Sequence, residues 1–219
     1  MVELPFQDRA EAGRLLGAEL ASSEHGANTI VMALPRGGVP VAAEVAEALQ
    51  APLDVVVVRK LGVPWEPELA MGAIAGGTRV LDHQLIGDLG ISGKEVEAVI
   101  ARETREMERR EKLYRGDLPP PDLRGRTIVL VDDGLATGST MVAAARYARS
   151  SYPRKLIIAA PVSSPQACRR LQQEADQCVC LAVREPFFAV GQWYSDFQQV
   201  TDQEVREILN RSHSRFCSA

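Results

Sequence analysis

The sequence is poor in aromatic residues and contains only four cysteines and three histidines among its 219 residues. Aromatic side chains make up 5% of the chain, which leaves few rings for the stacking that binds single-stranded nucleic acid. The formal net charge is −4, so the basic excess of a nucleic-acid-binding protein is also missing. No apolar run approaches the roughly 18 residues that cross a bilayer. We therefore expect neither a nucleic acid nor a membrane as a partner.

The cysteines form no recognisable metal site. Cys178 and Cys180 alternate on one face of an expected strand, but the second pair of ligands that zinc sites use is missing. We expect them to be small buried side chains. The N-terminal segment has acidic residues where a signal peptide has basic ones, and it has no apolar core. These features predict a reduced, cytoplasmic protein.

Short apolar runs alternate with helical patterns along most of the chain. Five of these runs are predicted to be buried strands, at residues 28–34, 53–58, 127–131, 156–160 and 178–183. The alternation is typical of a doubly wound α/β fold with a mostly parallel five-stranded sheet. With 46% hydrophobic residues, the 219 residues fit one domain whose core covers about residues 28–183.

Two segments interrupt this pattern. Residues 61–82 contain glycine and proline clusters, so we expect only short extended pieces there, with a hairpin at Gly76-Gly77. Residues 184–219 form a tail that begins with much of the chain's aromatic content and ends in a helix expected over 202–209. Long irregular segments of an α/β domain tend to be functional, and either segment could form a small hood over a site.

Residues 129–140 are the most informative part of the sequence. An apolar strand ends in Asp132 and Asp133, and a loop rich in glycine and hydroxyl residues then opens a helix. Loop amides and the helix dipole favour an anion there. The predicted phosphate-binding residues are Gly134, Leu135, Ala136, Thr137, Gly138, Ser139 and Thr140. Carboxylates accept hydrogen bonds from a vicinal diol or help to hold Mg²⁺, so a sugar phosphate suits both halves of the motif.

Two other phosphate-binding motifs are excluded, since no lysine follows Gly138 and no Gly-x-Gly-x-x-Gly occurs. The stretch from Asp132 to Thr140 instead resembles the signature of the type I phosphoribosyltransferases, which use 5-phosphoribosyl-1-pyrophosphate (PRPP). Pro35-Arg36-Gly37-Gly38 and Pro64-x-x-Pro67-Glu68 further resemble a group of stand-alone phosphoribosyltransferase-like proteins of undefined substrate.

The resemblance implies transfer of the 5-phosphoribosyl group from PRPP to a nitrogenous base, or the reverse pyrophosphorolysis, in a family that is commonly dimeric. It implies Mg²⁺ as a cofactor, held by Asp132 and Asp133 directly or through water. It implies that pyrophosphate binds the turn of Arg36, Gly37 and Gly38, which family members often hold with a non-proline cis peptide bond. The implied catalytic residues are Asp132, Asp133, Arg36 and Lys60, with Arg59 as the rival of Lys60.

The acceptor base is not identified by the sequence. The loop position at which 6-oxopurine enzymes of this family carry an aspartate is Ala136, which disfavours hypoxanthine and guanine without establishing adenine. Candidate base-binding residues are the tail aromatics Phe187, Phe188 and Trp193. The alternative function is a PRPP- or nucleotide-binding regulator that keeps the phosphate loop but lacks transferase activity.

Overall fold

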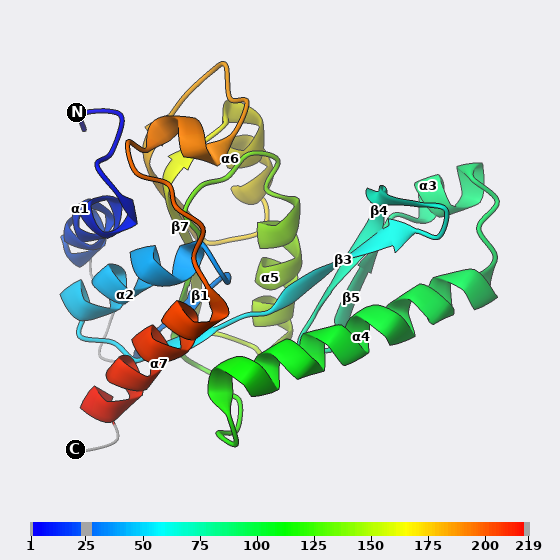
Figure 1. Cartoon of the computed structure of the whole chain (residues 1–219), viewed down its shortest axis with the longest axis horizontal. Helices are drawn as coiled ribbons and strands as arrows, with labels where there is room; N and C mark the ends of the chain where they lie inside the picture. Colours follow the sequence, from blue (N-terminus) through cyan, green and yellow to red (C-terminus); the bar gives the residue numbers. More distant parts are fainter. Residues whose placement is uncertain (1, 23–27, 217–219) are drawn as a thin grey trace.

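A computed structural model describes residues 2–22 and 28–216 of the chain (Figure 1). Its central sheet has five strands in the order β2-β1-β6-β7-β8, and every pairing in it is parallel. The strands are β1 (Thr29–Ala33), β2 (Leu53–Val55), β6 (Thr127–Val131), β7 (Lys155–Ser163) and β8 (Gln177–Val183). The predicted five-stranded α/β fold is therefore confirmed.

Helices cover both faces of this sheet. They are α1 (Arg9–Ala21) and α2 (Gly38–Ala48) on one face, and α5 (Ser139–Ser150) and α6 (Pro165–Leu171) on the other. Successive strand residues point to opposite faces, so Val129 and Val131 pack with the first pair while Ile128 and Leu130 pack with the second. Burial on both faces explains why the middle residues of β1, β6 and β7 are apolar.

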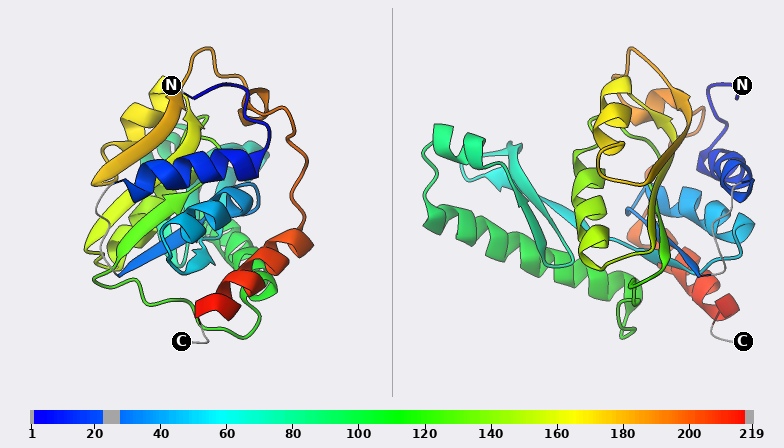
Figure 2. Two further views of the ribbon diagram at one scale, coloured as in Figure 1. Left: turned by 90° about the vertical axis from the view of Figure 1, so that its left-hand side faces the viewer. Right: turned by 180° about the vertical axis from the view of Figure 1, so that it is seen from behind.

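Residues 58–115 form an arm that projects from the side of the sheet (Figures 1 and 2). The arm contains β3 (Val58–Val63), β4 (Glu66–Ala75), β5 (Thr78–Leu81), α3 (His83–Asp88) and α4 (Gly93–Arg115). Its strands pair antiparallel in the order β3-β4-β5. The expectation of only short extended pieces over 61–82 is wrong, because β4 alone has 10 residues. The predicted turn at Gly76-Gly77 is confirmed and joins β4 to β5.

The β4 strand lacks a regular alternation of buried and exposed residues, which explains why its sequence did not predict a long strand. Its first five residues are exposed, whereas most of the remainder are buried. The buried part packs near α5, where Gly76 leaves room for the ring of Tyr147, which a Cβ atom would overlap. The capping box predicted at Ser92 and Glu95 is present and begins α4.

Several predicted boundaries shift by a few residues. The strand expected over 53–58 ends at Val55, and the next strand begins at Val58. The last helix, α7 (Asp202–Phe216), is longer than expected, and a short 3-10 helix occupies Val190–Trp193 in the tail. Among the residues described, none of the helices combines the length and apolarity needed to cross a bilayer.

The cysteines of β8 are half-buried rather than fully buried. Cys178 and Cys180 are free thiols that pack against the core shared with α5 and α6. Burial raises the pKa of Cys178 to about 11 and that of Cys180 to about 12, so both thiols stay protonated near neutral pH. Cys217 lies outside the described residues.

Candidate functional site

The loop between β6 and α5 lies at the carboxyl edge of the sheet and is fixed against the end of β7. The Leu135 N–H donates to the Val162 carbonyl at 2.9 Å, and the Leu135 carbonyl accepts from the Ser164 N–H at 2.9 Å. The Leu135 side chain is buried. Gly138 has a φ of +72°, a left-handed conformation that glycine adopts without strain, and α5 begins at the next residue.

A pocket of about 190 Å³ opens beside this loop. It is lined by Lys60, Asp132 and the segment from Gly134 to Met141. The structure thus brings the predicted phosphate-binding residues together with Asp132 and with a lysine that comes from the arm. The described lining does not include Asp133 or the turn at Arg36, which lie next to it rather than in it.

The turn before α2 packs directly on the acidic pair. Gly37 is the N-cap of α2 and Gly38 its first residue, and the Pro35–Arg36 peptide bond is cis, as the resemblance implied. A Cβ atom on Gly37 would overlap the Asp133 carboxylate, and one on Gly38 would lie 2.8 Å from the Val131 carbonyl oxygen. Glycine therefore leaves room for the Asp133 carboxylate at position 37 and for the backbone at the end of β6 at position 38, and the turn packs directly on the acidic pair.

Arg36 is near the start of α7. Its Nη1 lies 4.0 Å from Asp202 Oδ1, and the Tyr114 hydroxyl donates to the same oxygen at 2.7 Å. Burial and the bond to Asp202 raise the pKa of Tyr114 to about 12, so this phenol remains a donor. The Arg36 side chain is 36% exposed and therefore accessible to an anion. Neither Asp202 nor Tyr114 could be assigned to the site from the sequence.

Asp132 and Asp133 have different surroundings. Asp132 lines the pocket, and its Oδ1 accepts from the Asp133 N–H at 2.9 Å. The Asp133 Oδ2 accepts from Arg9 Nε at 2.8 Å, in an ion pair whose side chains are 11% and 12% exposed. Burial raises the pKa of Asp132, and the charge of Asp133 adds to this effect. Burial also raises the pKa of Asp133, although Arg9 opposes the shift.

Arg9 also joins the tail to the acidic pair. Its Nη1 donates to the Gln198 carbonyl at 2.8 Å, and its guanidinium lies 3.8 Å from the centroid of the Phe197 ring. The Tyr194 hydroxyl donates to the Asp133 carbonyl at 2.6 Å. We call these five residues the Arg9 clasp: Arg9, Asp133, Tyr194, Phe197 and Gln198. The sequence offers no sign of it, because Arg9 and Asp133 are 124 positions apart.

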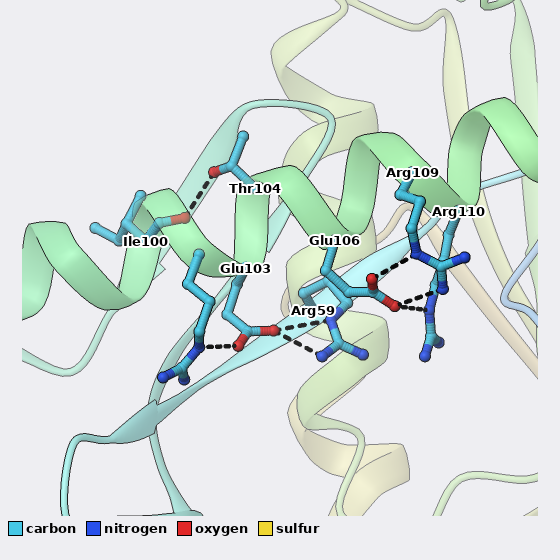
Figure 3. Close-up of polar contacts among 8 residues, drawn as sticks. Arg59, Ile100, Glu103, Thr104, Glu106, Arg109 and Arg110 are labelled. Atoms are coloured by element: carbon cyan, nitrogen blue, oxygen red, sulfur yellow. Dashed lines mark hydrogen bonds and ion pairs between the residues drawn. The ribbon is translucent and has the colours of Figure 1, made fainter.

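The neighbours Arg59 and Lys60 on β3 have separate roles in the structure. Arg59 Nε and Nη2 donate to Glu103 Oε2 on α4 at 2.9 and 2.7 Å (Figure 3). Arg102 Nε donates to the other oxygen of Glu103 at 2.9 Å. Burial tends to raise the pKa of Glu103, but the bonds from the two arginines outweigh it and leave the pKa lowered. Arg59 therefore ties the arm together, whereas Lys60 is exposed and lines the pocket.

The three candidate base-binding aromatics are not among the described residues that line the pocket. Phe187 and Trp193 are half-buried and pack on each other, with ring centroids 5.9 Å apart. Phe188 is 85% exposed. Within the described part of the chain, the buried Trp193 Nε1 has no hydrogen-bond partner. The tail nevertheless reaches the loop, because a Cβ atom on Gly134 would lie 2.5 Å from the Val190 side chain.

Comparison with known proteins shows which family the chain resembles. A family model described as a phosphoribosyl transferase domain matches residues 9–197. Two Mycobacterium tuberculosis proteins, from strains CDC 1551 / Oshkosh and H37Rv, carry provisional phosphoribosyl transferase names. Each is 46% identical over 215 residues, which cover 98% of this chain and 48% of the relative. The chain therefore spans about half the length of the curated relatives that it matches.

Two solved structures are also similar to this chain over nearly its whole length. The crystal structure of TT1426 from Thermus thermophilus is similar with a TM-score of 0.83 and 42% identity, over 95% of this chain and 99% of that one. A hypothetical protein from Neisseria gonorrhoeae, solved with bound ppGpp, is similar with a TM-score of 0.50 and 10% identity, over 96% of this chain and 99% of its own. At that identity the likeness concerns the fold alone.

Proposed function

Because the chain belongs to the phosphoribosyl transferase domain family, we propose that it transfers the 5-phosphoribosyl group from PRPP to a nitrogenous base and releases pyrophosphate. One observation carries the proposal. Asp132, loop 134–140 and Lys60 line a single pocket, and the Gly37-Gly38 turn packs on the acidic pair beside it. This arrangement offers adjacent places for a phosphate, a ribose diol and a pyrophosphate.

In the proposed reaction the bond between ribose C1 and the pyrophosphate oxygen breaks, and its electron pair leaves with pyrophosphate. A ring nitrogen of the base forms the new C1–N bond with its lone pair and releases its proton to solvent. The protein needs no nucleophile of its own. Asp132 would accept hydrogen bonds from the ribose hydroxyls, and its charge would favour the positive charge that develops on the sugar.

The remaining residues would orient the substrate. Loop 134–140 would hold the 5′-phosphate, which does not react, so its binding energy serves to position C1. Arg36 and Lys60 would stabilise negative charge on the departing pyrophosphate. Asp133 would position its neighbours and not bind the substrate, since Arg9 already donates to its carboxylate and Tyr194 to its carbonyl.

The donor set at the pocket fits a Mg²⁺ ion that arrives mainly on its substrate. Among the described residues, no group of three or more acidic, histidine or cysteine side chains could hold a metal alone. Mg²⁺ in phosphate-binding sites commonly uses one or two carboxylates with substrate phosphates and water. Asp132 would supply such a carboxylate, with Asp133 beside it. When bound, the ion would neutralise negative charge on the phosphates of PRPP.

Pyrophosphate release from PRPP in the presence of Mg²⁺ and a panel of nucleobases tests the proposal. We expect base-dependent release by the wild-type protein and a loss of about 100-fold in the Asp132→Asn variant, because the carboxylate that faces the sugar becomes neutral. Asp88→Asn, at an exposed position in α3, is the matched control and should retain full activity. Circular dichroism of both variants checks that the fold is kept.

The assay also separates the alternative function. PRPP binding by calorimetry without release on any base would overturn the transferase proposal and favour a PRPP- or nucleotide-binding regulator. The absence of PRPP binding would contradict both. Full activity of Asp132→Asn would contradict the role given to that carboxylate.

A further inference from the structure

A sugar 5′-phosphate bound at the loop would bring two negative charges, yet the loop supplies no cation. Residues 134–140 contain no lysine or arginine, and the two residues before them are acidic. Lys60 approaches the pocket from the arm. Arg36 lies at the separate turn before α2, beside Asp202. A second cation next to the phosphate loop would therefore balance phosphate charge that the predicted residues leave unpaired.

Arg170 on α6 lies next to this loop. Its Nη1 donates to Ser139 Oγ at 3.1 Å, and Ser139 lines the pocket. Among the described residues the Arg170 guanidinium makes no other hydrogen bond or ion pair, and the residue is exposed. A guanidinium has five N–H donors in a planar fork that matches phosphate, so most of its donors remain available to a ligand.

The position of α6 relative to the loop is fixed. The Ser164 hydroxyl donates to the Ala136 carbonyl at 2.6 Å and caps α6 by accepting from the Ala167 N–H at 2.9 Å. Leu171 packs against Gly138, where a Cβ atom would lie 3.3 Å from the leucine side chain. These contacts lie before and after Arg170 in the sequence, so its side chain starts from a backbone that is anchored to the loop.

The hydrogen bonds of Ser139 suggest how Arg170 acts. Ser139 Oγ accepts from Arg170 and also from the Thr137 hydroxyl, at 3.2 Å. With both lone pairs of the oxygen engaged, the Ser139 O–H is left to donate elsewhere. The pocket that Ser139 lines is the place where a phosphate oxygen could accept it.

We propose that Arg170 is a phosphate-binding residue of this site: it sets the Ser139 hydroxyl as a donor and supplies positive charge to the 5′-phosphate of the sugar ligand. The inference rests on the proposed function, and it names the 5′-phosphate as the group that the residue recognises. Arg170 should thus distinguish sugar phosphates from ligands that engage only the pyrophosphate turn.

Arg169 provides a matched control. It is the preceding residue of the same helix, it is exposed, and among the described residues its side chain makes no hydrogen bond or ion pair with the loop. Loss of Arg169 removes the same charge from the same helix. A difference between Arg169 and Arg170 variants therefore reports the local contact with the loop and not the overall field of the protein.

Titration calorimetry of the whole chain with ribose 5-phosphate, PRPP and inorganic pyrophosphate, each with Mg²⁺, tests the inference. For Arg170→Ala we expect Kd values for ribose 5-phosphate and PRPP to rise about 10- to 100-fold, the usual value of a hydrogen bond to a charged group. Pyrophosphate should bind as it does to wild type. Arg170→Lys should show a smaller rise, and Arg169→Ala should match wild type.

Three results would overturn the inference while leaving the proposed function intact. They are wild-type affinity of Arg170→Ala for ribose 5-phosphate, an equal loss for pyrophosphate, and an equal loss in Arg169→Ala. If the wild-type protein binds neither PRPP nor ribose 5-phosphate, the proposed function fails first. Circular dichroism and the thermal unfolding midpoint of Arg170→Ala, which should equal those of wild type, show that the comparison concerns folded protein.

Discussion

Neighbouring residues of one type can acquire different roles through contacts that are remote in sequence, as Asp132 and Asp133 illustrate. Asp133 is bound by Arg9 from the start of α1 and by Tyr194 from the tail, and Gly37 packs against its carboxylate. Asp132 lines the pocket. At the scale of the residue, Asp133 therefore positions the turn and the tail, and Asp132 is the acid available to a ligand.

Replacing Arg9 with methionine tests this division. The change keeps an apolar stem near Phe197 but leaves the Asp133 carboxylate buried without its partner. Removing one partner of a buried ion pair commonly costs about 3–5 kcal/mol. We expect the free energy of unfolding to fall by about 3 kcal/mol at pH 7, since Asp133 can take up a proton and limit the loss. Urea denaturation measures the change.

The pH dependence of this variant has a defined sign. Without Arg9, the already raised pKa of Asp133 rises further. A carboxyl whose pKa is raised by folding contributes stability below its unfolded value and loses it as pH rises through the folded value. The difference in free energy of unfolding between wild type and Arg9→Met should therefore grow from pH 4 to pH 7. Arg14→Met, at an exposed position of α1, should stay within about 0.5 kcal/mol of wild type. An equal loss in both variants would contradict the clasp.

At the scale of the element, α4 carries many charged residues, and they differ in how much they contribute to stability. Glu106 accepts from Arg109 and Arg110, and these bonds lower its pKa to about 2 (Figure 3). Such surface pairs contribute roughly 0–1 kcal/mol. Glu103 is different, because its side chain is buried on the side of α4 that faces β3 and accepts from two arginines. The attachment of the arm strand to α4 should depend on this one carboxylate more than on the exposed pairs.

The Glu103→Gln variant should be about 2 kcal/mol less stable than wild type at pH 7, because charged hydrogen bonds are lost and Arg59 is left without its counter-ion. Folding lowers the pKa of Glu103, so its contribution is present above the unfolded value of 4.5 and is lost as pH falls through the folded value. The difference in free energy of unfolding between wild type and variant should narrow below pH 4.5. Urea denaturation from pH 7 to below pH 4.5 measures this difference.

The exposed pair of Glu97 and Arg79 supplies the control, since its side chains are 64% and 47% exposed. Glu97→Gln should change stability by less than about 1 kcal/mol. Two results would show that Glu103 has no special role. One is a stability difference between wild type and Glu103→Gln that stays constant down to pH 2, and the other is an equal difference for Glu97→Gln.

The elements that the sequence predicts well are those whose local pattern agrees with their final environment. Strand Thr127–Val131 is apolar after its first residue because helices cover both faces, and this run is visible in the local sequence. The β4 strand lacks it, since its outer half is exposed and its inner half is buried by α4 and α5. Both of these helices follow β4 in the chain, and α5 is more than 60 residues away, so the sequence around β4 does not contain the reason for its burial.

The same argument explains which site residues could be predicted. The loop at 132–140 is contiguous, so its amides, hydroxyls and acids show in one stretch of sequence. Lys60 required a family resemblance, and the structure places it on the pocket. Arg9 and Arg170 were not predicted, and neither was the contact of the tail residue Tyr194 with Asp133. All three side chains come from helices or segments that are far from the loop in the sequence. Contacts of that kind depend on the tertiary fold, and no pattern in the neighbouring sequence indicates them.

At the scale of the whole molecule, the site takes side chains from parts of the chain that are far apart in the sequence. Arg9 comes from α1, Lys60 from the arm, Arg36 from the turn before α2, and Tyr194 from the tail. The arm in turn packs on α7 through α4 (Figure 2). A ligand that requires all of these parts binds only the fully folded chain, so it should stabilise the molecule as one unit.

Thermal unfolding with PRPP and Mg²⁺ tests this coupling. A ligand at about 100 times its Kd adds about 2.7 kcal/mol, and a chain of this size gains about 2–4 °C for each kcal/mol. We therefore expect the Tm to rise by about 5–10 °C in a single transition. Chelation of Mg²⁺ should reduce the rise without changing the Tm of the free protein, because the described residues hold no metal cluster of their own. A second transition that PRPP leaves unmoved would show that part of the chain unfolds independently of the site, and a PRPP shift that survives chelation would contradict the role of Mg²⁺.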